Sequence, residues 1–174
     1  LDSLRRNISR GQRDVALFEL GMVTRPLPGA SHTAPVPGVD RRPDDATIAS
    51  IDAAVPSQPR HAAVVLTGDA DRAGWWGAGR AADWTDALDA VRTVAGALAV
   101  PVAVSAGDAA PWHPGRCAAI TLADGTLVGY AGELHPKVLD RLGLPARTCA
   151  AELDIDVLTT ASAEPTRLKG FSTQ

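Results

Sequence analysis

One stretch decides the fold of this chain: residues 112–136, which read WHPGRCAAITLADGTLVGYAGELHP. Within it, residues 117–122 and 126–134 are rich in apolar and β-branched side chains, a composition typical of strands. Asp124-Gly125 lies between these two runs and supplies the positive φ values that a tight reversal needs. The stretch therefore predicts a β-hairpin, whose two strands must run antiparallel.

Both edges of the predicted hairpin carry a histidine followed by a proline, His113-Pro114 and His135-Pro136. Proline has no amide donor and drives the residue before it toward an extended conformation, so we expect each pair at an end of the ladder. The two histidines are nearly equidistant from the turn. We therefore expect His113 and His135 to lie close together as hydrogen-bonded structural residues.

Patterning along the rest of the chain predicts a mixture of helices and strands. The clearest helix follows Asp83, which is placed to cap it, and its apolar residues from Trp84 to Leu98 recur at helical spacing as a core stripe. Further helices are expected over 1–10, 44–55, 135–142 and 155–160, and further strands over 14–24, 61–67, 102–104 and 149–154. This order predicts an α+β domain with a mostly antiparallel sheet and helices on one side of it.

Length indicates one domain. A chain of 174 residues can bury a single core but is too short for two ordinary domains. Its start at Leu1, without methionine, suggests a piece of a longer protein. We expect a core module over residues 1–160 and a linker over 161–174 that leads to a following domain.

Composition narrows the class of protein further. No apolar run approaches the roughly 20 residues of a membrane span and no leader opens the chain, so we expect a soluble cytoplasmic protein without membrane contact. The net charge of −3 argues against a dominant nucleic-acid surface. Cys117 and Cys149 lie in apolar runs without Cys-x-x-Cys spacing, which indicates small buried thiols in a reducing compartment.

The hairpin and three earlier segments together resemble one family. The residues His113 to Arg116, Asp124-Gly125 and Gly132 to Pro136 are similar to the HPGR, DG and GELHP elements of the β subunit of bacterial phenylalanine–tRNA ligases. The earlier segments that resemble the same family, in the same order, are Arg6–Gly11 with Val15–Gly21, Arg60–Gly68 and Trp75–Gly77. The resemblance spans roughly Leu4 to Asp154, which is nearly the whole chain.

The resemblance implies a fold and a role. In this family the matching module is a degenerate copy of the class II aminoacyl-tRNA synthetase catalytic domain, built on an antiparallel sheet. The implied role is support, without chemistry of its own, for the catalytic α subunit in a heterotetramer of two α and two β subunits. The whole enzyme joins phenylalanine to its tRNA during translation, using ATP and magnesium. The family's lysine and glycine after the Trp-Trp-Gly segment are absent from Asp83–Leu88, so no role tied to them is transferred.

Four residues are candidates for interface contacts. Trp75 and Trp76 are large indoles of the kind enriched at interface hot spots, and we expect one in the core and the other at an interface. Arg6 and Arg10 fall at helical spacing and indicate either a solvated helix face or a partner contact. In the resembled family a partner surface is expected, because its subunits assemble.

A rival hypothesis uses Glu133, His113 and His135 as the site of an independent small hydrolase, since a carboxylate beside an imidazole is a base with its orienting group. No serine, threonine or cysteine is placed as an obvious nucleophile, and no histidine has a partner at metal-ligand spacing. We therefore assign no catalytic, cofactor-binding or metal-binding residue in this chain. A free-standing synthetase-like paralogue is the second alternative.

Overall fold

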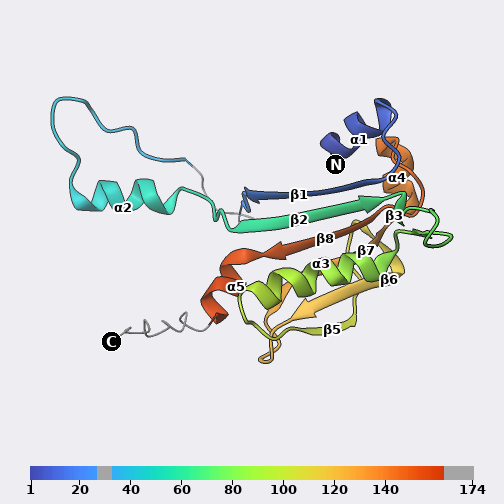
Figure 1. The fold of residues 1–174 in the computed structure, drawn as a ribbon. Helices are drawn as coiled ribbons and strands as arrows, with labels where there is room; N and C mark the ends of the chain where they lie inside the picture. Colours follow the sequence, from blue (N-terminus) through green and yellow to red (C-terminus); the bar gives the residue numbers. More distant parts are fainter. Residues whose placement is uncertain (27–32, 163–174) are drawn as a thin grey trace, which may run out of the picture.

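A computed structural model describes residues 1–26 and 33–162 as an α+β domain with one large sheet (Figure 1). Every helix and strand that the sequence predicts is present within a few residues of its expected bounds. The helices are α1 (Asp2–Ser9), α2 (Asp45–Ala53), α3 (Trp84–Ala97), α4 (Pro136–Leu142) and α5 (Ile155–Ala161). The strands are β1 (Val15–Met22), β2 (Arg60–Thr67), β3 (Asp69–Asp71), β4 (Arg80–Ala81), β5 (Ala103–Ala106), β6 (Trp112–Thr121), β7 (Leu127–Leu134) and β8 (Cys149–Asp154). The linker expected over 161–174 lies outside the described residues from position 163 onward.

The large sheet has six strands in the order β1-β2-β8-β7-β6-β5, and every neighbouring pair is antiparallel. The predicted hairpin forms β6 and β7. Strand β8 comes from the C-terminal end of the domain and lies between β2 and β7 (Figure 1). This last strand therefore joins the N-terminal half of the sheet to the hairpin.

The hairpin turn differs in detail from its prediction. Only Gly125 has a positive φ, of 86°, whereas Asp124 does not. The Gly125 amide donates to the Leu122 carbonyl at 3.0 Å, and the Asp124 side chain accepts from the Thr126 amide at 2.9 Å. Asp124 therefore acts through its side chain, and Gly125 alone supplies the left-handed residue.

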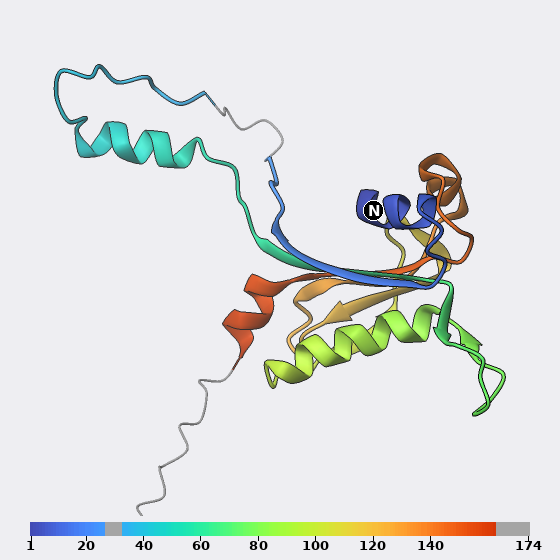
Figure 2. The same cartoon turned by 45° about the horizontal axis from the view of Figure 1, so that its top comes forward.

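Helices cover both faces of the sheet, so the prediction of helices on one side was wrong. Figure 2 shows α3 and α5 below the sheet and α1 and α4 above it. The strands bury apolar residues on both faces: in β8, Cys149, Ala151 and Leu153 join the cluster under α3, while Ala150 joins the cluster under α1 and α4. Successive strand residues point to opposite faces, so each face needs its own helical cover.

Helix α3 fills most of the larger core. Its N-terminus carries a capping box, in which the Asp83 side chain accepts from the Thr85 amide at 2.7 Å and Asp86 accepts from the Asp83 amide at 2.8 Å. Most of the predicted apolar stripe packs against β8 and β7: Ala87, Leu88, Val91 and Ala95 are buried, Val94 and Leu98 are partly buried, and Trp84 is the exposed member. Trp84 is 46% exposed, because the first residue of the helix lies at a surface pocket beside the edge strand β5.

Two parts of the chain lie outside the layered body. The arm that carries α2 stands away from the sheet in both views (Figures 1 and 2), and α2 buries no residue. Backbone hydrogen bonds at its base join Val23 to Pro59 at 2.9 Å and Arg25 to Ser57 at 2.8 Å. The second part is the small β3–β4 hairpin, which the sequence did not predict.

Candidate functional site

His113-Pro114 lies inside strand β6, so the prediction that this pair marks a strand end was wrong. Trp112 pairs with Leu134 and Cys117 pairs with Gly132, so residues 113–116 form a bulge opposite Glu133 alone. A bulge leaves residues out of the ladder, which is why a proline without an amide donor is accommodated there. His135-Pro136 is placed as predicted, at the end of β7 and the start of α4.

The bulge brings the two histidines together. The rings of His113 and His135 stack with their centroids 6.1 Å apart. His113 Nδ1 hydrogen bonds to the Pro114 carbonyl, and His135 Nδ1 accepts from the Lys137 amide at 3.1 Å, which caps α4. Each ring is thus held by neighbouring backbone.

Glu133 is buried, with 2% of its surface exposed, and it binds two arginines. Arg116 Nη1 lies 2.6 Å from Oε2, and Arg147 Nη2 lies 3.1 Å from Oε1. Among the contacts of the described residues, none joins Glu133 to His113 or His135. The carboxylate therefore ties the bulge to the loop between α4 and β8 rather than orienting an imidazole.

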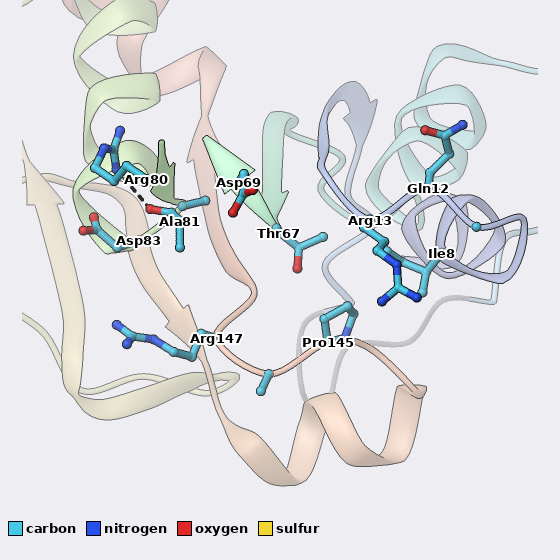
Figure 3. A pocket seen from close by; sticks show the side chains of 14 residues that line it. Ile8, Gln12, Arg13, Thr67, Asp69, Arg80, Ala81, Asp83, Pro145 and Arg147 are labelled. Carbon is cyan, nitrogen blue, oxygen red and sulfur yellow. Dashed lines mark hydrogen bonds between the residues drawn. The ribbon is translucent and has the colours of Figure 1, made fainter. Parts of the chain in front are cut away.

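A pocket of about 650 Å³ opens at one end of the sheet, where loops from four parts of the chain meet (Figure 3). Its charged residues are Arg13, Arg80, Arg147, Asp69 and Asp83. Arg80 is already paired with Asp86 at 2.7 Å and Arg147 with Glu133, which leaves Arg13 as the arginine without an ion pair to a described residue. The walls therefore carry nearly balanced charge.

None of the candidate site residues lines this pocket, and sequence reasoning missed it. One signal pointed there. Two segments of the family resemblance, Arg6–Gly11 and Arg60–Gly68, end on the pocket wall, at Gly11 and at Thr67-Gly68. The convergence of these segment ends becomes visible only once β1 and β2 are paired.

The four interface candidates are all exposed. Trp75 is 95% and Trp76 67% exposed, so the expectation that one of them lies in the core does not fit their exposure. Both lie at the tip of the β3–β4 hairpin, outside the hydrophobic clusters. Arg6 lies on α1 and Arg10 is the residue that caps its C-terminal end, and neither side chain forms an ion pair with a residue that the structure describes. The structure does not bring the tryptophans and these arginines into one site.

A buried polar cluster around His61 was also missed. His61 Nδ1 donates to Glu152 at 2.7 Å, while Arg25 Nη2 donates to Nε2 at 2.9 Å. Arg25 also pairs with Asp154 at 3.8 Å. Glu152 and Asp154 are two residues apart on β8, which pairs with β2. Side chains two apart on a strand share one face of the sheet, so the spacing of these two acidic residues was the sequence signal for the cluster. The cluster fastens the base of the α2 arm to the sheet.

Three further observations concern the cysteines, the possible metal ligands and the lengths of the helices. Cys117 and Cys149 are buried and unpaired, as predicted, and burial raises the pKa of both thiols, that of Cys149 to about 12. Across residues 1–26 and 33–162, no group of three or more His, Cys, Asp or Glu side chains is arranged to hold a metal ion. Within the same residues, none of the helices combines the length and apolar character that a membrane crossing requires.

Comparison with known proteins gives a consistent result. Residues 1–155 match the family model described as the phenylalanyl tRNA synthetase beta chain CLM domain. The chain is 55% identical over 166 residues to the phenylalanine–tRNA ligase beta subunit of Streptomyces avermitilis, with 94% of this chain and 20% of that relative covered. The corresponding subunits of Thermobifida fusca and Mycolicibacterium paratuberculosis are 48% and 49% identical, over 94% and 95% of this chain and 20% of each relative. The chain thus spans about a fifth of the length of these curated relatives.

Proposed function

Because this chain belongs to the family of phenylalanyl tRNA synthetase beta chain CLM domains, we propose that it is a non-catalytic, class II-like core of a phenylalanine–tRNA ligase β subunit. Its role is to hold the catalytic α subunit while the complex attaches phenylalanine to tRNA. ATP, magnesium, tRNA and the heterotetramer belong to the whole enzyme, which works in the cytoplasm. The family match over residues 1–155 carries this proposal.

The geometry around Glu133 supports a structural role for the hairpin. Both carboxylate oxygens accept from guanidinium groups and the side chain is 3% exposed, an arrangement that fits a buried structural ion pair better than a general base. His135 is committed to capping α4. Burial raises the pKa of the Cys117 and Cys149 thiols, and the thiolate is the reactive form of cysteine. These contacts of Glu133 and His135 disfavour the hydrolase alternative.

The open face of β1 supports a role in assembly. Phe18, Leu20 and Met22 alternate along this edge strand on the side that faces α3, and all three are exposed, because α3 contacts β2, β7 and β8 instead. Contiguous exposed apolar side chains mark surfaces that another protein covers. A module that acts inside a larger enzyme is expected to carry such a surface.

The experiment compares the isolated chain with the whole enzyme. We expect no phenylalanine-dependent ATP–pyrophosphate exchange and no hydrolase activity from residues 1–174. In the complete enzyme, His135→Ala is expected to lower the melting temperature and to leave kcat for aminoacylation unchanged. Hydrolytic activity of the isolated chain that disappears with His135→Ala would support the hydrolase alternative and overturn the proposal. A coding sequence that ends near residue 174 would favour the free-standing paralogue.

A further inference from the structure

The tip of the β3–β4 hairpin displays two indoles to solvent. Trp75 is 95% exposed and Trp76 is 67% exposed, and the two residues are adjacent and lie on one turn. The hairpin projects from the end of the sheet in both ribbon views (Figures 1 and 2). The exposed area of two tryptophans is unfavourable in water, so this display needs an explanation outside the isolated domain.

The tip is built as a rigid unit. Gly74 and Gly77 exchange backbone hydrogen bonds of 2.9 and 3.1 Å, which close the turn around the two tryptophans. The Trp76 indole N–H donates to the Arg72 carbonyl at 3.2 Å, and the two indoles meet edge to face with centroids 5.8 Å apart. The Trp76 ring lies over Gly74, where a Cβ atom would come within 2.7 Å of it. Such fixed aromatic side chains lose little conformational entropy when they bind.

Ion pairs fix the base of the hairpin to the domain. Arg72 pairs with Asp14 at 3.2 Å, and Arg80 pairs with Asp86 at 2.7 Å and with Asp71 at 3.4 Å. Residues 73–79 between these pairs include no charged side chain. The tip is thus an apolar, neutral surface whose nearest cations are already neutralised.

These charges decide the kind of partner. Affinity for a nucleic acid comes largely from Lys and Arg that neutralise its phosphates, and the two arginines of the hairpin, Arg72 and Arg80, are already ion-paired. An apolar cleft on a protein instead gains from burying two indoles without displacing any ion pair. The Trp75 indole N–H has no acceptor among the described residues, whereas that of Trp76 is already used. The matching cleft therefore has apolar walls and a carbonyl or carboxylate oxygen at its rim.

We propose that the Trp75-Trp76 tip inserts into an apolar cleft of the catalytic α subunit, with Trp75 as the anchor. This inference rests on the proposed function for the identity of the partner. Trp76 acts mainly by holding the Trp75 ring, because its own N–H is bonded inside the hairpin. The tip thereby adds a contact distinct from the exposed face of β1.

The test uses the full-length β chain that contains these residues, with the α subunit, and measures the dissociation constant of the complex by titration. Trp75→Ala is expected to weaken the complex about 30-fold or more, the loss typical of an anchor residue, and Trp76→Ala is expected to weaken it less. Val39→Ala is the matched control, because Val39 is a fully exposed apolar residue on the α2 arm and its change should leave affinity unaltered. Unchanged melting temperatures of all three variants will show that the hairpin change is local.

Each outcome decides a separate point. An α–β complex that is indifferent to Trp75→Ala overturns the inference and leaves the proposed function intact. Unchanged α-subunit affinity with weakened tRNA binding also overturns it, in favour of a nucleic-acid contact. If the unaltered full-length chain forms no complex with the α subunit, both the proposed function and the inference fail.

Discussion

Replacing Glu133 with glutamine isolates the contribution of one buried carboxylate to the fold. Glu133 lies opposite the β6 bulge and accepts hydrogen bonds from Arg116 at 2.6 Å and from Arg147 at 3.1 Å. Glutamine keeps the volume of the side chain but removes its charge. It also places an amide donor against a guanidinium donor, so one of the two hydrogen bonds is lost.

The magnitude follows from the burial of each partner. Breaking a fully buried ion pair costs about 3–5 kcal/mol, and breaking an exposed pair costs about 0.2–1 kcal/mol. The Glu133 side chain is 3% exposed, but those of Arg116 and Arg147 are 48% and 66% exposed, so both guanidinium groups remain hydrated after the change. We therefore expect Glu133→Gln to lower the free energy of unfolding by about 2 kcal/mol, between these limits.

Urea unfolding of the isolated chain, followed by far-ultraviolet circular dichroism, measures this loss. Glu19→Gln is the matched control, because Glu19 is an exposed glutamate on β1 and its change should stay within about 0.5 kcal/mol. A Glu133→Gln variant as stable as the Glu19→Gln variant would refute the structural role assigned to this carboxylate.

Three further predictions concern the core, the helix cap and the sheet. Burial raises the pKa of the Cys149 thiol to about 12, whereas the thiol of the unfolded chain ionises near pH 9. The free energy of unfolding should therefore fall by about 1.4 kcal/mol per pH unit between pH about 9 and about 12. Urea unfolding measured across this range should show that slope in the unaltered chain and lose it in Cys149→Ala. Asp83→Ala should lower the free energy of unfolding by about 1 kcal/mol at pH 7, because it removes the helix cap. Hydrogen bonds from Thr85 lower the pKa of Asp83, so the stability difference between this variant and the unaltered chain should shrink as the pH falls below about 4. Gly132→Ala should unfold the domain or lower its free energy of unfolding by more than about 3 kcal/mol, because the new Cβ would lie 2.0 Å from the Arg116 carbonyl oxygen. The control is Gly96→Ala in α3, where the new Cβ meets no atom, so this change should raise the midpoint of thermal unfolding by a few degrees. Equal destabilisation by the two alanine substitutions would contradict the close strand approach at Gly132.

Local patterns explain why most elements were predictable. The α3 helix is specified by its cap at Asp83 and its apolar spacing, and the β6–β7 hairpin by Gly125 and the runs on either side. These signals act over a few residues and do not depend on the rest of the fold. The β3–β4 hairpin escaped prediction because its strands Asp69–Asp71 and Arg80–Ala81 are short and polar, without an apolar alternation.

Pairing between distant segments explains what the sequence did not reveal. The position of β8 between β2 and β7 depends on contacts across the chain, and with it the helical cover on both faces. The stacked histidines were predictable because His113 and His135 lie at similar distances from one turn. The Arg147 partner of Glu133 was not, because it lies in a loop whose place is set by the tertiary fold.

The most direct test of the central claim is affinity purification of the tagged full-length β chain from its own cell extract, beside tagged residues 1–174. The account predicts that the full-length chain recovers the small catalytic subunit and that the recovered complex charges tRNA with phenylalanine in an ATP-dependent reaction. Recovery by residues 1–174 as well would locate the contact within this module. A full-length chain that recovers no catalytic subunit would contradict the account.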